Sequence, residues 1–165
     1  MSTIPYCQAP DWTVSQWLNT PHPLTPASLQ GVVTVLHVFQ MLCPACVSMA
    51  IPQAKAIHLA FPPDSVKVVG LHSVFEHHEA MNAGALQAFV HEYRIRFPVG
   101  IDQPSDKSPI PLTMEKYGIE GTPTLILIDK SGHIRLQHLG HVDDLRAGAL
   151  IGQLLTETSP EPIDP

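Results

Sequence analysis

Phe39-Gln40-Met41-Leu42-Cys43-Pro44-Ala45-Cys46 carries two cysteines separated by two residues, at a point where the character of the sequence changes. The apolar, β-branched run 32–39 leads into it and predicts a buried strand. A run of small and apolar residues over 47–61 follows and predicts a helix, which Pro52 interrupts because proline has no backbone N–H. A Cys-x-x-Cys at a strand-to-helix junction in a chain of this size is typical of a redox-active pair.

The two cysteines are expected to have different roles. Cys43 should lie at the helix N-terminus, where free backbone N–H groups and the positive end of the helix dipole favour the thiolate. We therefore predict that Cys43 is the attacking thiolate and that Cys46, one turn later on the same face, is the resolving thiol. Leu42, Pro44 and Ala45 flank the cysteines and are predicted to contact the substrate.

Composition excludes several other classes of protein. The chain has 165 residues, 44% hydrophobic and 15% charged, which suits one globular domain with a full core. Its net charge of −6 argues against nucleic-acid binding, because no basic run could neutralise phosphates. No apolar run is long enough for a membrane span, and the first residues lack the features of a signal peptide, so we expect a cytoplasmic protein. Three cysteines are too few for a disulfide scaffold, and Cys7 has no obvious partner.

The remaining pattern divides the chain into three parts. Five prolines punctuate residues 1–30 and predict an irregular arm over 1–23, with at most a short strand around Trp12-Thr13-Val14. Trp12 and Trp17 would pack this arm onto the domain. The domain is expected over 24–155, and the acidic, proline-rich segment 156–165 is expected to be a flexible tail.

Within the domain, the elements after the first helix are expected to be a strand, a helix, an extended segment, a hairpin and a last helix. Their ranges are 66–71, 83–94, 97–101, 124–129 with 133–139, and from a cap at Asp143 to about 155. Strand–helix–strand order implies parallel crossovers and the hairpin adds antiparallel strands, so we predict an α/β sandwich with a mixed central sheet.

Three segments of this pattern resemble the thioredoxin fold, specifically the TlpA/ResA-like thiol–disulfide oxidoreductases. They are the strand ending at Val38-Phe39 with Cys43-Pro44-Ala45-Cys46, then Phe97-Pro98-Val99-Gly100-Ile101-Asp102, and Tyr117-Gly118-Ile119-Glu120-Gly121-Thr122-Pro123-Thr124-Leu125-Ile126-Leu127-Ile128-Asp129. The last is similar to the family's Gly-x-Pro-Thr-x-x-x-Ile-Asp. The match covers about residues 24–155, and its two motifs about eighty residues apart are more specific than a lone Cys-x-x-Cys.

The resemblance implies a thioredoxin-like three-layer sandwich, with a mixed sheet, helices on both faces and a central βαβ-type insert. It implies an enzyme that exchanges a disulfide with protein or small-molecule thiols and is served by an upstream dithiol reductant or oxidant. No cofactor or metal is expected beyond the Cys43–Cys46 disulfide. It also implies that Thr122-Pro123 is a cis peptide packed against the disulfide, with the Thr122 backbone pairing with substrate and the bulk of Pro123 keeping metal off the cysteines. The direction of the redox reaction does not follow from the resemblance.

The sequence also departs from the family pattern. Leu42 stands where a tryptophan is usual, and Pro52 falls one residue later than the usual helix proline. His37 stands six residues before Cys43, where thioredoxins carry a buried aspartate, so it is either a hydrogen-bonded core residue or a proton shuttle for Cys46. Glu76 is either an acid/base group near the disulfide or a solvated loop carboxylate.

Three alternative functions are weighed against this one. His72, His77, His78 and Glu79 have metal-ligand chemistry and, with the two cysteines, could form a copper-binding or chaperone module of the same fold, although such modules space their cysteines by three residues. A peroxiredoxin would need proline at Leu36 and threonine at Gln40, and both are missing. An adaptor would use its nearly neutral first sixty residues, in which Asp11 and Lys55 are the only charged groups, for docking alone.

Overall fold

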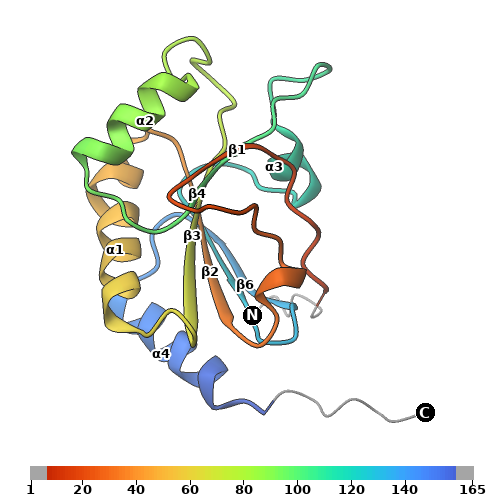
Figure 1. The fold of residues 1–165 in the computed structure, drawn as a ribbon, viewed down its shortest axis with the longest axis vertical. Coiled ribbons are helices and arrows are strands. Elements are labelled where there is room, and N and C mark those ends of the chain that lie inside the picture. The colour runs from red at the N-terminus through yellow and green to blue at the C-terminus, as the bar shows by residue number, and fades with distance from the viewer. Residues whose placement is uncertain (1–6, 159–165) are drawn as a thin grey trace.

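A six-stranded mixed sheet forms the centre of the protein, with the strands in the order β1-β4-β3-β2-β5-β6 (Figure 1). The computed structural model describes residues 7–158. The strands are β1 (Val14–Leu18), β2 (Val33–Phe39), β3 (Val66–His72), β4 (Val99–Asp102), β5 (Thr124–Ile128) and β6 (Ile134–Leu139). The helices are α1 (Ile51–Ala60), α2 (Ala83–Glu92), α3 (Leu112–Lys116) and α4 (Asp144–Thr156), with a 3-10 turn η1 (Ala27–Leu29) and a π-helical turn η2 (Cys46–Ala50).

The strand before the cysteines, β2, lies in the middle of this sheet, and all its residues are buried. It pairs in parallel with β3, which places Phe39 opposite His72, and antiparallel with β5, which places His37 opposite Leu125. β4 is parallel to β3, and β6 is antiparallel to β5, so the sheet is mixed as predicted. The carboxyl ends of β2, β3 and β4 therefore lie at one edge of the sheet, where the two cysteines follow β2.

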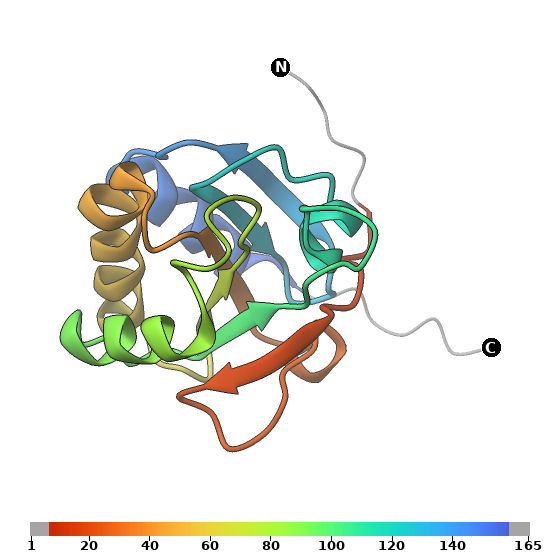
Figure 2. The ribbon, with the colours of Figure 1, turned by 90° about the horizontal axis from the view of Figure 1, so that it is seen from above.

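Side chains from both faces of the sheet build two separate hydrophobic cores. Helices lie on both sides of the sheet (Figure 2). Val35 and Phe39 of β2 belong to the core that α1, α2 and α4 cover. Leu36 and Val38 point the other way, into a core covered by α3 and by the residues that precede β1. This arrangement confirms the predicted thioredoxin-like three-layer sandwich with helices on both faces.

The predicted insert is formed by β3, α2 and β4, and the two strands are parallel. The N-terminal arm is more regular than its prolines suggest, because β1 joins the edge of the sheet antiparallel to β4. Before β1, Gln8 forms an isolated bridge with His133. Residues 1–6 of the expected arm and 159–165 of the expected tail lie outside the described residues.

Pro52 affects the first helix differently from the expected interruption. Helical structure begins at Pro44 and continues to Ala60, but the turn Cys46–Ala50 is π-helical, and the Ile51 N–H donates to the carbonyl of Cys46. Pro52 follows this widened turn, within the first turn of α1. Such turns are rare inside helices and occur often at functional sites, and this one includes Cys46.

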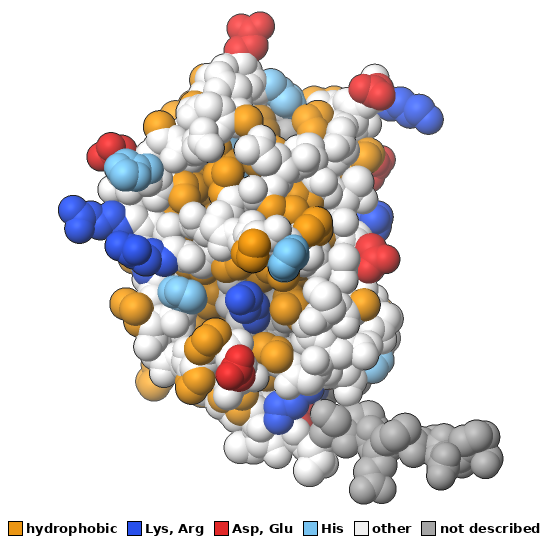
Figure 3. Space-filling view, viewed as in Figure 1, with side chains coloured by type: hydrophobic (Ala, Val, Ile, Leu, Met, Phe, Trp, Pro, Cys, Tyr) orange, Lys and Arg blue, Asp and Glu red, His pale blue; other side chains and the backbone are white. Residues whose placement is uncertain are grey.

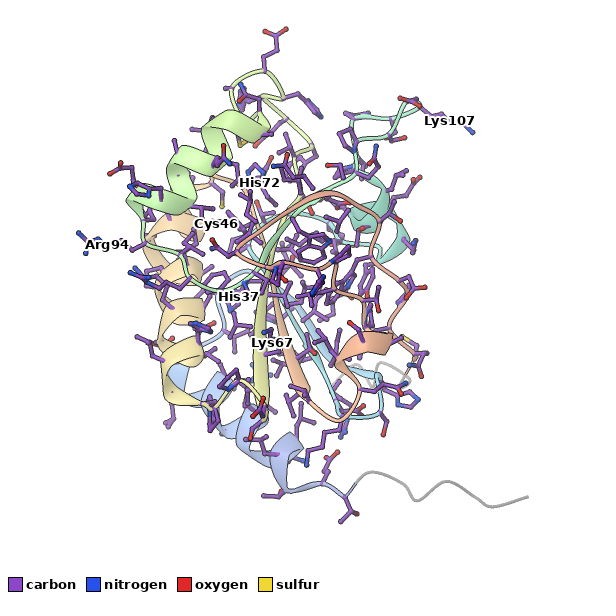
Figure 4. The ribbon with its side chains drawn as sticks, viewed as in Figure 1. His37, Cys46, Lys67, His72, Arg94 and Lys107 are labelled. Carbon is purple, nitrogen blue, oxygen red and sulfur yellow. The ribbon has the colours of Figure 1, made fainter. Side chains whose placement is uncertain are left out.

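Charged side chains are sparse on the face seen in Figure 3 and lie mostly toward its edges, with hydrophobic atoms between them. Arg94 and Lys107, for example, extend away from the body on opposite sides (Figure 4). Among the described residues, no helix combines the length and the apolar character that crossing a membrane requires.

Candidate active site

The two cysteines of the Cys-x-x-Cys motif are both free thiols at the start of the first helix. The Cys43 carbonyl accepts the Val47 N–H at 3.1 Å, so Cys43 occupies the N-cap position of the helix. Its Sγ accepts the backbone N–H of Cys46 at 3.2 Å, as an N-cap side chain does. This donor, together with the helix terminus, stabilises negative charge on the Cys43 sulfur.

Exposure separates the two thiols. Cys43 is half-buried, whereas Cys46 is 0% exposed and belongs to the core under α1. Burial and, to a smaller extent, the contact with Cys43 together raise the pKa of the Cys46 thiol to about 12. Cys43 can therefore be reached by another molecule, and Cys46 stays a protonated thiol until its neighbour has reacted.

The second motif lies directly against the first, although the two are far apart in the sequence. The Thr122–Pro123 peptide bond is cis, as the resemblance implies. The Cys43 thiol donates to the Thr122 carbonyl, with 3.5 Å between Sγ and O. Pro123 is buried, and its carbonyl accepts the Gly140 N–H at 2.7 Å. The loop before β5 is thus fixed beside the exposed thiol.

The rim of this site includes exposed apolar side chains. Leu42, immediately before Cys43, is 58% exposed, Pro44 is exposed and Ala45 is half-buried. Met49 on η2 is also exposed, and so is Leu139. Leu139 pairs with Thr124 at the start of β5 and lies next to Gly121, so it flanks the Pro123 loop.

Gln40 is a site residue that the sequence analysis missed. It is 2% exposed, and its Oε1 accepts the backbone N–H of Phe75 at 3.3 Å. Its Nε2 donates to Oγ1 of Thr122 at 3.5 Å. One side chain therefore connects the Cys43 loop to the segment after β3 and to the Pro123 loop. A polar residue directly after a fully apolar strand was the signal available in the sequence.

By the alternation of β2, His37 lies on the same side of the sheet as Phe39, which shares a core with Cys46. Its ring is 4% exposed, and its Nε2 has no hydrogen-bond partner among the described residues. Burial and, to a smaller extent, the nearby His141 together lower the pKa of His37 to about 4. The groups that act on Cys46 are Cys43, Gln40 and Thr122. The structure thus gives the expected proton shuttle no direct contact.

The histidine-rich segment that begins at the last residue of β3 separates into an inner and an outer part. His72 points inward and is 1% exposed, while Glu76, His77, His78 and Glu79 are exposed. Glu76 makes no hydrogen bond or ion pair with any described residue, which is typical of a solvated loop carboxylate. Within residues 7–158, no three His, Cys, Asp or Glu side chains come together in a group that could hold a metal ion.

Comparison with known proteins agrees with this geometry. Residues 5–137 match the model of the AhpC/TSA family. The crystal structure of a thioredoxin-like superfamily protein is 53% identical, with a TM-score of 0.90, over 93% of this chain and 99% of that one. A thiol-disulfide isomerase from Corynebacterium glutamicum is 48% identical, with a TM-score of 0.87, over 91% of this chain and 98% of that one.

A more distant relative shares the same architecture. StoA from Bacillus subtilis is 26% identical, with a TM-score of 0.58, over 73% of this chain and 82% of that one. No curated protein matches the chain at a significant level.

Proposed function

The chain belongs to the AhpC/TSA family and is a thioredoxin-fold thiol–disulfide oxidoreductase, and we propose that it exchanges disulfides with protein substrates through Cys43 and Cys46. One observation carries the proposal. A half-exposed thiol at a helix N-cap lies above a fully buried thiol, and it is within 3.5 Å of the Thr122 carbonyl.

The reaction follows from the different exposure of the thiols. The Cys43 thiolate attacks a substrate disulfide R–S–S–R′, forms the mixed disulfide Cys43–S–S–R and releases R′–S⁻. The Cys46 sulfur then attacks the Cys43 sulfur and closes the Cys43–Cys46 disulfide. The substrate leaves as R–S⁻, which takes up the proton that Cys46 has lost and becomes R–SH. Two electrons have passed to the substrate, and a dithiol partner restores the reduced pair. The reverse sequence oxidises a substrate dithiol, and no cofactor takes part in either direction.

The rim supports a protein segment as the substrate. Leu42, Pro44 and Ala45 adjoin Cys43 in the chain and Thr122 lies beside it in the Pro123 loop, and the exposed side chains there include the apolar Leu42, Pro44 and Leu139. The Thr122 carbonyl lies beside the reacting sulfur, where an extended backbone could pair with this loop. Apolar contacts around a backbone pairing site suit a cysteine in an extended, apolar polypeptide.

Trapping of the mixed disulfide tests the proposal. In Cys46→Ser the resolving thiol is gone, so Cys43 should accumulate a stable mixed disulfide when the protein is mixed with a disulfide-bonded peptide. Cys43→Ser should trap nothing, and Cys7→Ser, which removes the other cysteine, should behave like the unaltered protein. Mass spectrometry under non-reducing conditions measures all three. Failure of Cys46→Ser to trap peptide, or equal trapping by Cys43→Ser, would overturn the assignment.

A titration of the reduced protein distinguishes the proposed redox function from the copper-binding alternative. Reduced protein titrated with Cu(I) should leave both cysteines open to alkylation if they serve only as a redox pair. Stoichiometric copper that protects Cys43 and Cys46 together would favour the metal-binding function. Equilibration of the unaltered protein with glutathione then gives the reduction potential, which decides the direction of the reaction in a given compartment.

A further inference from the structure

His72, the last residue of β3, reaches across to the turn that carries Cys43. Its ring is 1% exposed, and its Nε2 accepts the backbone N–H of Met41 at 3.3 Å. The ring also packs on Phe39, with 5.2 Å between the ring centroids and 51° between the planes. Met41 is two residues before Cys43, so this side chain contacts the backbone that positions the attacking thiol.

The Met41 N–H needs this acceptor because the sheet has already ended. The last pair between β2 and β3 is Phe39 with His72, so no β3 carbonyl follows for Met41. Met41 is only 9% exposed, and a buried N–H without a partner is destabilising. The His72 ring supplies the acceptor that a continued strand would have supplied.

Two neighbouring contacts join the same two segments. The Ser73 N–H donates to the Phe39 carbonyl at 3.1 Å, and the Phe75 N–H donates to Gln40 Oε1 at 3.3 Å. The Cys43 turn is therefore tied to the end of β3 at three successive points. His72 makes the contact nearest to Cys43 in the sequence.

We infer that His72 is a positioning residue for the dithiol: its unprotonated Nε2 holds the Met41 N–H and thereby fixes the turn that sets Cys43 against Cys46 and Thr122. The inference rests on the proposed dithiol function of this site. It assigns to His72 the tautomer with its proton on Nδ1, because Nε2 must accept. It also makes His72 part of the redox site rather than of a metal site with His77 and His78.

A fixed turn favours closure of the disulfide. Bringing the two sulfurs into bonding geometry costs less conformational entropy when the backbone before Cys43 is already ordered. Loss of the acceptor should therefore shift the equilibrium from disulfide toward dithiol, without removing either reacting thiol.

Two variants separate the acceptor from the packing of the ring. His72→Gln can place its Oε1 near the position of Nε2, whereas His72→Leu keeps an apolar side chain against Phe39 but accepts nothing. In His72→Leu we expect amide hydrogen exchange at Met41 to rise at least tenfold, and the glutathione equilibrium to shift at least threefold toward dithiol. His72→Gln should stay within twofold of the unaltered protein in both measurements.

Each possible result either supports or overturns the inference about His72. Unchanged Met41 exchange in folded His72→Leu, or a shift in His72→Gln as large as in His72→Leu, would overturn the inference. If His72→Leu does not fold, nitrogen NMR of the unaltered protein still tests it, since Nε2 must be unprotonated and coupled to the Met41 amide; a protonated Nε2 would overturn it. Should the unaltered protein form no Cys43–Cys46 disulfide with glutathione, the proposed function fails, while Met41 exchange still reports on His72 itself.

Discussion

His37 and His72 are two buried histidines with different roles. Burial lowers the pKa of each to about 4, so both are neutral in the folded protein at neutral pH. His72 uses its neutral ring to accept a backbone N–H, whereas Nε2 of His37 has no partner among the described residues. The hydrogen bond of His72 stabilises a turn, whereas His37 leaves a polar atom in the core without a hydrogen bond.

Both histidines should make the protein sensitive to acid. The unfolded chain binds a proton at each near pH 6.5, but the folded protein binds it only near pH 4. Between these values the unfolded state holds more protons, so the free energy of unfolding falls as the pH drops from 6.5 to 4, by about 2 kcal/mol per histidine at pH 5.

We expect His37→Leu to remove one of these two contributions, because leucine fills the apolar site and does not titrate. Urea unfolding at pH 7 and pH 5 measures the difference, with the exposed His22→Gln as control. The variant should also be at least as stable as the unaltered protein at pH 7, and its rate of thiol alkylation against pH should be unchanged. An altered alkylation profile would restore the proton-shuttle hypothesis for this residue.

For individual residues, spacing in the sequence identified the reactive groups but not the side chains that position them. Cys43, Cys46 and Pro123 belong to motifs whose residue types carry the chemistry. Gln40 and His72 act by crossing between segments that are more than thirty residues apart, and no spacing within one segment indicates such contacts. His37 was considered as a proton shuttle because it stands six residues before Cys43, yet spacing along the chain does not imply contact with Cys46.

Among the secondary-structure elements, the helix α3 depends for its N-terminal cap on a side chain from the strand β4. α3 has only five residues, and its N-cap residue, Pro111, makes no side-chain cap. Asp102, at the end of β4, replaces the cap: its Oδ1 accepts the Thr113 N–H at 2.8 Å, and its Oδ2 accepts the Met114 N–H at 2.9 Å. Oδ2 also accepts the Ser73 hydroxyl at 2.8 Å, which connects the segment after β3 to the same point.

Asp102→Asn should therefore destabilise the protein by about 1–3 kcal/mol, because the new amide group faces N–H or O–H donors and leaves at least one of them without an acceptor. Chemical denaturation measures the loss, and faster amide exchange at Thr113 and Met114 would locate it. Asp106→Asn, in the exposed loop before α3, removes a similar charge and should have little effect. Equal losses in the two variants would show that charge rather than capping matters.

Elements were easiest to predict where burial acts on both faces of a segment. The apolar runs of β2, β3 and β5 and the Asp143 cap of α4 were predicted to within about a residue. The position and length of β1, Val14–Leu18, were predicted less accurately, because this edge strand lies in a proline-rich segment, shows no alternation of burial and gains its regularity from pairing with β4. The π-helical turn at Cys46–Ala50 was missed, because it depends on where the helix packs as well as on Pro52.

For the molecule as a whole, the N-terminal arm completes the second core. Ala9 and Trp12 are buried there with Tyr117, on the face of the sheet opposite to Cys46. Tyr117 connects the arm to the domain: its hydroxyl accepts the Trp12 indole N–H at 2.9 Å and donates to the Pro10 carbonyl at 2.5 Å. Burial raises the pKa of Tyr117, so this hydroxyl stays protonated and can serve as the donor.

Tyr117→Phe should loosen the arm without disturbing the redox reaction. The change keeps the ring in the core but removes the partner of a buried indole N–H, so we expect a loss of about 2 kcal/mol in the free energy of unfolding and greater quenching of tryptophan fluorescence by acrylamide. Tyr93→Phe is the matched control, because Tyr93 is 42% exposed and stacks on Phe89 through its ring alone. The glutathione equilibrium should be the same in both variants, since the dithiol belongs to the other core. A shift of that equilibrium in Tyr117→Phe alone would show that the two cores are coupled through the sheet, and an unchanged stability would show that the arm is held by its apolar contacts without the hydroxyl.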